Sequence, residues 1–326
     1  MLSEFEVIRK FFSRTPRLGN RVNLSVGDDA ALLSVASGHE LVAACDMMLV
    51  GRHFFADVEP AKLGHKCLAV NLSDMAAMGA VPRWCLLALA LPIADEAWLA
   101  EFARGFHDLA DRYGVDLVGG DTTRGPYTAC VQILGEVPSG TALRRDGARL
   151  DDDIWVSGTL GDAALAVAHV RGELKLDTRA ALHCLQRLET PQPRVVLGEA
   201  LRGIAHSAID VSDGFAADLG HILQRSRAGA EIVFEQLPRS DALIRSRDAH
   251  AERVRDAILA GGDDYELCFT AAQSQRATLA ELADKLGLRL SRVGRIVAPA
   301  AGLVVRDADG RDIALPRTGF DHFAAP

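Results

Sequence analysis

The chain alternates between short apolar runs of strand length and longer stretches with helical spacing. Residues 41–45 are apolar and end at Asp46, which predicts a buried strand with the aspartate at its carboxyl end. Residues 60–78 are typical of a helix with Pro60 in its first turn and Gly79 at its end. Further strands are predicted where apolar residues dominate, at residues 84–91, 115–118 and 128–137.

The helix with the strongest pattern is predicted between Asp95 and Gly114. Its large apolar residues stand three to four positions apart, which places them on one face: Trp98, Phe102, Phe106, Leu109 and Tyr113. Aspartate favours the start of a helix and glycine its end. We therefore expect this helix to open at Asp95 and to stop at Gly114.

The second half of the chain shows the same mixture of strands and helices. Helices are predicted from Asp162, after the glycine turn 158–161, and after Ser212-Asp213-Gly214. Strands are predicted at residues 154–157, 207–211 and 265–270. Acidic turns are expected where the strands meet the helices.

A polar segment separates the two halves. Residues 139–153 contain glycine and three arginines, which is typical of a linker. With 326 residues the chain is long enough for two domains. We predict an α+β protein with an amino-terminal domain over residues 1–138 and a carboxyl-terminal domain over residues 154–326.

Composition narrows the class of protein. Hydrophobic residues make up 49% of the chain and charged residues 25%, as in an ordinary globular protein. A formal net charge of −8 argues against a general nucleic-acid binder. The sequence has neither an apolar stretch that spans a bilayer nor the basic-then-apolar order of a secretion signal. We expect no membrane partner and a cytoplasmic location, with the six cysteines as buried free thiols because none is in a CxxC pair.

Carboxylates gather on short turns, most of them bounded by glycine. They occur at Asp28-Asp29, Asp46, Asp74, Asp121, Asp210, Asp213 and Asp263-Asp264. Any one of these is explained by a tight turn. Together they suggest a shared cation site, because carboxylates repel one another unless cations lie between them. Magnesium typically uses one or two carboxylates together with substrate phosphates, so the pattern predicts a metal–phosphate site.

Some of these residues admit two interpretations. Asp74 lies in an apolar helical stretch where an unpaired charge is costly, and Asn71 shares its helix face. The turn at Ser212 and Asp213 suits an anion bound to backbone N–H groups, but an N-cap explains it equally well. Arg145 is explained either by pairing with a nucleotide phosphate or by a solvated position on the surface. His53 suits a structural role or substrate positioning.

Known nucleotide motifs are missing from the sequence. There is no GxxxxGK[ST] segment of a P-loop and no HRD and DFG pair of a protein kinase.

Five segments resemble the thiamine-monophosphate kinase family, in the superfamily of aminoimidazole ribonucleotide synthetase and selenophosphate synthetase. They are GDDAAL (27–32), NLSDMAAMG (71–79), GGDTTRGP (119–126), IDVSDG (209–214) and GGDDYELCF (261–269). The resemblance covers nearly the whole chain.

The resemblance implies a fold and an assembly. It implies an α+β chain of two mixed α/β domains of the aminoimidazole ribonucleotide synthetase-like type, with the active site in the interdomain cleft. It also implies a homodimer formed through the amino-terminal domain. The reaction it implies transfers the γ-phosphoryl group of ATP, as co-substrate, to thiamine monophosphate with the help of several Mg²⁺ ions.

The resemblance also implies roles for single residues. The magnesium ligands are expected to be Asp29, Asp46, Asp74, Asp121, Asp210 and Asp213. ATP binding is expected at Gly120, Asp121, Arg145 and Ser212. Thiamine monophosphate is expected near His53, Asp263 and Phe320.

The chain departs from the family at three places. Ala44-Cys45 stands where the family often has hydroxyl residues, so any metal contact of Ala44 and Cys45 must come from their backbone carbonyls. Asp263 replaces a frequent glutamate, and Phe320 replaces a tryptophan or tyrosine.

No general base is required by the expected chemistry. The acceptor is a phosphate monoester whose second pKa is about 6, so it is already anionic at neutral pH. Positioning and neutralisation of charge then carry the catalysis. Two alternatives remain open: a related ATP-dependent synthetase of the same superfamily, and a non-catalytic protein that binds divalent cations.

Overall fold

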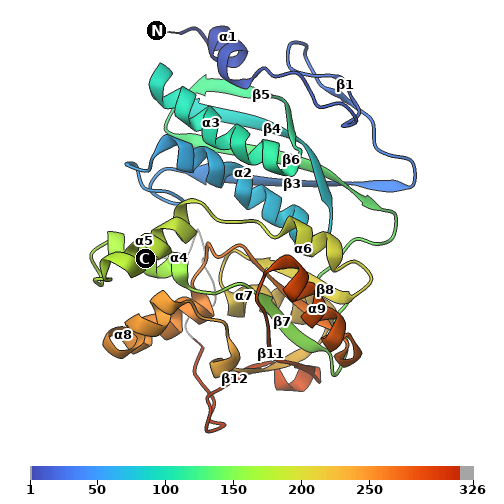
Figure 1. Ribbon diagram of the computed structural model, residues 1–326, viewed down its shortest axis with the longest axis vertical. Helices are drawn as coiled ribbons and strands as arrows, with labels where there is room; N and C mark the ends of the chain where they lie inside the picture. Colours follow the sequence, from blue (N-terminus) through green and yellow to red (C-terminus); the bar gives the residue numbers. More distant parts are fainter. Residues whose placement is uncertain (1, 316–326) are drawn as a thin grey trace. The chain divides into compact units, whose positions relative to one another are not determined.

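The computed structural model describes residues 2–315 (Figure 1). The chain divides into two units, which are taken here one at a time. Unit 1 comprises residues 1–75 and 80–142, and unit 2 comprises residues 76–79 and 143–326.

Unit 1 is built on a four-stranded sheet in the order β3-β6-β4-β5. Its strands are β3 (His39–Leu49), β4 (Val81–Leu91), β5 (Asp116–Arg124) and β6 (Thr128–Pro138). Only β4 and β5 are parallel, and α3 connects them. The helices are α1 (Glu4–Val7), the π-helix Ile8–Phe12, α2 (Pro60–Ala77) and α3 (Glu96–Tyr113), and a second small sheet pairs β1 (Val22–Leu24) with β2 (Leu32–Leu33).

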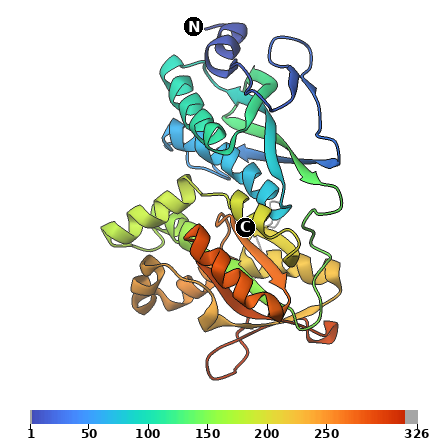
Figure 2. The ribbon, with the colours of Figure 1, turned by 45° about the vertical axis from the view of Figure 1, so that its right-hand side comes forward.

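Helix α3 has the ends and the buried face that its sequence predicts. The Asp95 side chain caps it by accepting the backbone N–H of Trp98 at 2.9 Å, and Gly114 closes it with a φ of 68°. Its apolar face is buried at Leu99, Phe102, Phe106 and Leu109. Helices α2 and α3 lie side by side over the sheet in both ribbon views (Figures 1 and 2).

Two glycines let these helices approach closely. A Cβ atom added to Gly64 of α2 would lie 2.1 Å from the Phe102 carbonyl oxygen, and one added to Gly105 of α3 would lie 1.8 Å from that of Ala61. Any larger residue at either position would therefore force the helices apart.

The opposite face of this sheet keeps apolar side chains exposed along β3. Leu41, Met47 and Leu49 are 50%, 54% and 36% exposed. In β4 alternate residues from Leu87 to Leu91 are buried, as expected for a sheet with helices on one face.

Unit 2 holds a six-stranded sheet in the order β12-β9-β11-β7-β10-β8. Its strands are β7 (Asp153–Ser157), β8 (Ala205–Val211), β9 (Gly229–Val233), β10 (Glu266–Ala271), β11 (Leu290–Val297) and β12 (Leu303–Arg306). Its helices are α4 (Asp162–Val170), α5 (Thr178–Glu189), α6 (Val195–Ala200), α7 (Phe215–Ser226), α8 (Asp241–Ala260) and α9 (Arg276–Leu286). Short 3-10 turns occur at Phe234–Gln236, Gln273–Gln275 and Pro299–Ala301.

The central strands of unit 2 are buried along their whole length. Every residue of β7 and of β10 is buried, so both faces of the sheet are covered there. All pairings are antiparallel except that of β12 with β9. Across residues 2–315, no helix combines the length and the apolar character needed to cross a membrane.

Most predicted elements are confirmed, but the prediction of acidic turns is wrong at two places. Asp46 lies inside β3 rather than at its end, and Gly119-Gly120-Asp121 lies inside β5. The reason is pairing: β3 bonds to β6 as far as Leu49, and β5 bonds to β4 as far as Arg124. Polar residues thus continue strands that their sequence alone would end.

The segment predicted as a linker packs against β8 and α7 of unit 2. Arg144 accepts the backbone N–H of Ala208 in β8 at 3.1 Å through its carbonyl oxygen. Ser226 of α7 donates its hydroxyl to the Arg145 carbonyl oxygen at 2.9 Å. Gly147 lies so close to β8 that an added Cβ would be 1.9 Å from the His206 carbonyl oxygen.

The cysteines are free, as predicted, but not all are buried. Cys67, Cys85, Cys184 and Cys268 are buried. Cys45 is exposed and Cys130 is half-buried, because the uncovered face of β3 and β6 holds them.

Candidate active site

Asp46 and Asp74 belong to one corner of unit 1. The backbone N–H of Asp46 in β3 donates to Asn71 Oδ1 of α2 at 3.1 Å. Asn71 is fully buried and anchors its amide by donating to the Cys67 carbonyl oxygen at 3.0 Å. Asp74 follows Asn71 by three residues and therefore lies on the same side of the helix. Helix α2, which holds Asp74, is thus hydrogen-bonded through Asn71 to strand β3, which holds Asp46.

Asp121 lies on the other edge of the same sheet. Register places Asp46 in one row with Val131, Leu87 and Gly120, and Asp121 in the next row. Three strand spacings separate the two edge strands, about 14 Å. Unit 1 therefore groups Asp46 with Asp74 but keeps Asp121 apart from them.

Gly120 stands where only glycine fits. Its φ is +150°, and an added Cβ atom would lie 1.9 Å from the Leu87 carbonyl oxygen of β4. A side chain there would push β5 away from β4, so Gly120 also fixes the backbone that carries Asp121.

The remaining candidates of unit 1 have mixed surroundings. Asp29 is exposed in a loop, and its N–H donates to Asp28 Oδ1 at 2.8 Å. Ala44 and Cys45 lie in β3 just before Asp46. His53 is half-buried, and its Nδ1 accepts the Leu49 N–H at 3.0 Å. In the tautomer that accepts this N–H, the ring proton of a neutral His53 is on Nε2.

Unit 2 gathers Asp210, Ser212 and Asp213 where β8 meets α7. Asp210 is buried in β8, and Ser212 and Asp213 are half-buried. One oxygen of Asp218, in the first turn of α7, accepts three successive backbone N–H groups, those of Ser212, Asp213 and Gly214, at 3.0, 3.1 and 3.1 Å. Asp218 thus fixes the turn that carries the candidates.

This contact corrects one sequence-based interpretation, the N-cap, and bears on another. Neither Ser212 nor Asp213 caps α7, because Gly214 occupies the N-cap position. The N–H groups that were expected to receive a phosphate are donated to Asp218 instead. Burial, followed by the charges of Asp210 and Asp213, raises the pKa of Asp218 to about 8. This concentration of negative charge is what a divalent cation relieves.

The loop 261–265 is fastened to the same turn. Asp263 donates its N–H to the Ser212 carbonyl oxygen at 2.9 Å, and Tyr265 donates to that of Val211 at 2.8 Å. Gly262 permits this approach, because an added Cβ atom would lie 2.4 Å from the Ser212 oxygen. Asp263 is thereby held beside the Asp210–Asp213 turn.

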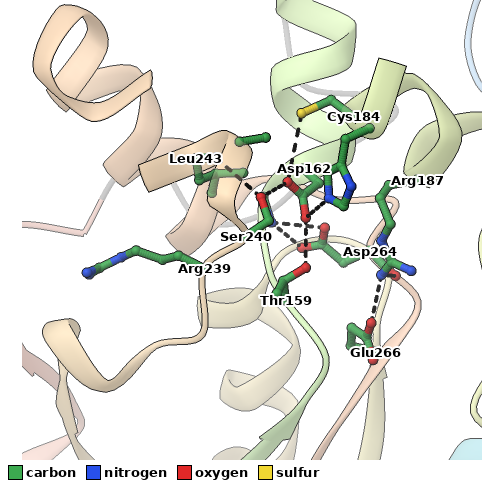
Figure 3. Close-up of polar contacts among 12 residues, drawn as sticks. Thr159, Asp162, Cys184, Arg187, Arg239, Ser240, Leu243, Asp264 and Glu266 are labelled. Atoms are coloured by element: carbon green, nitrogen blue, oxygen red, sulfur yellow. Dashed lines mark hydrogen bonds and ion pairs between the residues drawn. The ribbon is translucent and has the colours of Figure 1, made fainter. Parts of the chain in front are cut away.

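Asp264 ties this loop to the glycine turn after β7. Its buried carboxylate accepts the Gly161 N–H at 2.9 Å, and its carbonyl oxygen accepts Arg187 at 3.2 Å (Figure 3). Burial raises the pKa of Asp264 well above its ordinary value, Arg187 opposes the rise, and Asp162 and Glu266 add to it.

Glu266 is a fully buried carboxylate that holds two arginines. It accepts Arg187 at 2.6 Å, the Nε of Arg194 at 2.6 Å and the hydroxyl of Ser157 at 2.6 Å. Gly158 packs against it, since an added Cβ atom would lie 2.0 Å from its Oε1. The ion pairs join β10 to α5 and to the start of α6.

Asp162 organises a second buried cluster (Figure 3). It accepts the Thr159 hydroxyl at 2.7 Å and the hydroxyl of Ser240, the N-cap of α8, while His183 Nε2 lies 3.4 Å away. Burial acts to raise the pKa of Asp162, but hydrogen bonds from His183, Ser240 and Thr159 outweigh it and lower the pKa. Burial raises the pKa of the neighbouring Cys184 to about 12, so that thiol is unreactive at neutral pH.

Two further candidates remain to be placed. Arg145 is exposed, as either of its interpretations allows. Phe320 lies outside the described residues. Within residues 2–315, no three His, Cys, Asp or Glu side chains are grouped closely enough to hold a metal ion by themselves.

The candidate residues nevertheless suit Mg²⁺ chemically. The ion takes oxygen ligands and typically needs only one or two carboxylates beside substrate phosphates. The Asp46–Asp74 corner and the Asp210–Asp213 turn each offer such a pair.

Sequence reasoning missed Asp218 and Glu266, and it noted Asp264 in an acidic turn without giving it a role. An acid in the first turn of a helix is a known signal, and it was available for Asp218. Glu266 opens an apolar strand, so the argument that a buried charge needs a partner applied to it as it did to Asp74. Nothing in the sequence connects Asp264 with Gly161, because 103 residues separate them.

Asp264 gives a stability contribution that falls as pH rises. Its folded-state pKa is raised, so the folded chain keeps a proton that the unfolded chain releases near pH 3.9. The contribution is complete below the unfolded pKa and is lost as pH rises toward the folded pKa. Asp264→Asn keeps the acceptor for Gly161 and cannot ionise. We expect its stability relative to the unmodified chain to increase as pH rises above the unfolded-state pKa of about 3.9.

Thermal unfolding of both proteins at increasing pH measures the effect. Asp108→Asn, at an exposed position of α3, is the matched control and should show no such trend. A constant difference between Asp264→Asn and the unmodified chain at all pH values would contradict the assignment.

Comparison with known proteins places the chain in a family. Residues 27–137 match the model of the AIR synthase related protein N-terminal domain, and residues 150–306 match that of its C-terminal domain. The chain is 44% identical over 325 residues to the thiamine-monophosphate kinase of Escherichia coli strain K12, covering 99% of each chain.

Similarity to solved structures leads to the same family. Thiamine-monophosphate kinase from Stenotrophomonas maltophilia K279a matches with a TM-score of 0.84 and 48% identity, covering 91% of this chain and 93% of that one. AaThiL complexed with AMPPCP and TMP matches with a TM-score of 0.78 and 28% identity, covering 95% and 100%. Both domains are thus of the AIR synthase related type, which confirms the predicted fold class. The chain belongs to the thiamine-monophosphate kinase family.

Proposed function

We propose that this chain transfers the γ-phosphoryl group of ATP to the phosphate of thiamine monophosphate, giving thiamine diphosphate and ADP. The observation that carries the proposal is full-length similarity to thiamine-monophosphate kinases, 44% identity over 325 residues in one relative. AaThiL was solved with AMPPCP and TMP, which supports the same pair of ligands here. The same similarity favours the kinase over a related synthetase or a non-catalytic cation binder.

The chain's own residues position two polyanions. Mg²⁺ ions, when bound, screen the repulsion between the phosphates and align their oxygens. Asp29, Asp46, Asp74, Asp121, Asp210 and Asp213 are proposed to hold these ions, together with the carbonyl oxygens of Ala44 and Cys45. Gly120, Asp121, Arg145 and Ser212 are proposed to contact ATP.

Thiamine monophosphate is proposed to contact His53, Asp263 and Phe320. His53 offers a ring N–H donor, and Asp263 offers a carboxylate that suits the N–H groups or the positive charge of thiamine. An aromatic ring attracts a cation by roughly 0.5–2 kcal/mol, which suits Phe320 and the thiazolium. No side chain is needed as a general base, because the acceptor phosphate is already ionised.

A homodimer in the cytoplasm is the proposed working form. The uncovered face of the unit 1 sheet supports it, because Leu41, Met47 and Leu49 expose apolar surface along one strand. Sedimentation velocity at micromolar concentration tests this: a species of twice the chain mass supports it, and a monomer refutes it.

One assay tests the activity. The chain is incubated with Mg²⁺, ATP and thiamine monophosphate, and thiamine diphosphate is sought by chromatography. Its formation supports the proposal. ATP hydrolysis without thiamine diphosphate would favour a related synthetase, and no turnover of ATP would favour a cation-binding protein.

A further inference from the structure

Tyr265 makes a contact that the proposed function does not use. Its phenol O–H donates to Asp263 Oδ1 at 2.9 Å. Both side chains are half-buried, on either side of the buried Asp264. We infer that Tyr265 is a positioning residue that holds the Asp263 carboxylate for the organic part of the thiamine substrate.

The backbone of this loop is built for that contact. Asp263 and Tyr265 have φ values of 64° and 50°, in the left-handed region that residues other than glycine seldom adopt. Asp tolerates this region better than most residues, whereas a bulky tyrosine there is unusual. Such conformations persist only where the surroundings fix them, and they gather at functional sites.

The surroundings fix this loop from three sides. The backbone N–H groups of Asp263 and Tyr265 are donated to Ser212 and Val211. The Asp264 carboxylate is anchored on Gly161. With the backbone held by these contacts, the orientation of the Asp263 carboxylate depends on its own two side-chain torsions.

One hydrogen bond is enough to restrict those torsions. Aspartate has only two side-chain torsions, so a single contact with the phenol restricts much of its freedom. The phenol contact thus gives the Asp263 carboxylate a defined direction.

The chemistry of that carboxylate selects the part of the substrate it meets. An ionised carboxylate only accepts hydrogen bonds, and it repels a phosphate. Thiamine monophosphate offers the N–H groups of its aminopyrimidine and the positive charge of its thiazolium. The inference therefore concerns binding of the thiamine moiety rather than phosphoryl transfer, and it rests on the proposed function.

Tyr265→Phe tests it by removing one oxygen atom and keeping the ring. We expect KM for thiamine monophosphate to rise roughly ten-fold, because a hydrogen bond to a charged group is lost. The turnover number and KM for ATP should change by less than about two-fold, since the contact serves binding and not the transition state. Tyr113→Phe, at the end of α3 in unit 1, is the matched control and should change none of these three quantities.

A double-mutant cycle separates positioning from a merely structural role. If Tyr265 acts through Asp263, the variant with both Tyr265→Phe and Asp263→Asn should match Asp263→Asn alone within about two-fold in KM. Multiplied effects, an unchanged KM for thiamine monophosphate in Tyr265→Phe, or an equal loss for both substrates would overturn the inference. An unmodified chain that forms no thiamine diphosphate would overturn the proposed function itself, and the inference with it.

Discussion

Replacing Asp46 or Asp121 with asparagine is expected to abolish formation of thiamine diphosphate while the fold remains intact. Asparagine has nearly the same shape but no charge, so it keeps the packing and loses the affinity of a carboxylate for Mg²⁺. Because neutralisation of charge carries this chemistry, we expect turnover to fall by at least about 100-fold. Steady-state assays at saturating Mg²⁺ and ATP measure the fall.

The control is an aspartate that the proposal does not use. Asp108→Asn removes an exposed carboxylate of α3 that pairs only loosely with Arg104, at 3.4 Å. It should keep full activity. Circular dichroism and thermal unfolding should show all three variants folded. Near-normal turnover in both Asp46→Asn and Asp121→Asn would refute the proposed metal ligands.

Glu266→Ala is expected to destabilise the chain more than loss of any surface ion pair. The carboxylate is fully buried, and its partners Arg187 and Arg194 are only 15% and 16% exposed. Its removal leaves two partly buried guanidinium groups without their common acceptor. Breaking a buried pair in this way costs about 3–5 kcal/mol in the free energy of unfolding. Denaturant unfolding measures the change.

Glu101→Ala provides the comparison. Glu101 pairs with Arg104 at 2.7 Å on the surface of α3, where both side chains are more than half exposed. Exposed pairs contribute about 0–1 kcal/mol, so this variant should unfold nearly as the unmodified chain does. Equal losses in the two variants would show that Glu266 is not the anchor that its contacts indicate.

Local patterns in the sequence predicted the elements well where a single element carries the signal. Helix α3 begins after Asp95 and ends before Gly114, as its cap residues and apolar spacing predict. Patterns predicted less well where pairing overrides composition, as in β3 and β5, which continue through Asp46 and Asp121. A strand's end depends on its neighbour, and the neighbour is not in the local sequence.

The sequence by itself determined the fold class and the family, because both rest on local spacing and short motifs, and it predicted which acidic residues serve the site. Only the tertiary structure decided how those residues are held. Asp218 takes the N–H groups expected to meet a phosphate, Glu266 joins two arginines, and Tyr265 orients Asp263. These contacts depend on backbone conformation and on partners up to 79 residues away. No local pattern encodes contacts over such separations. The sequence therefore does not distinguish an aspartate that binds a metal from one that caps a helix or anchors a loop.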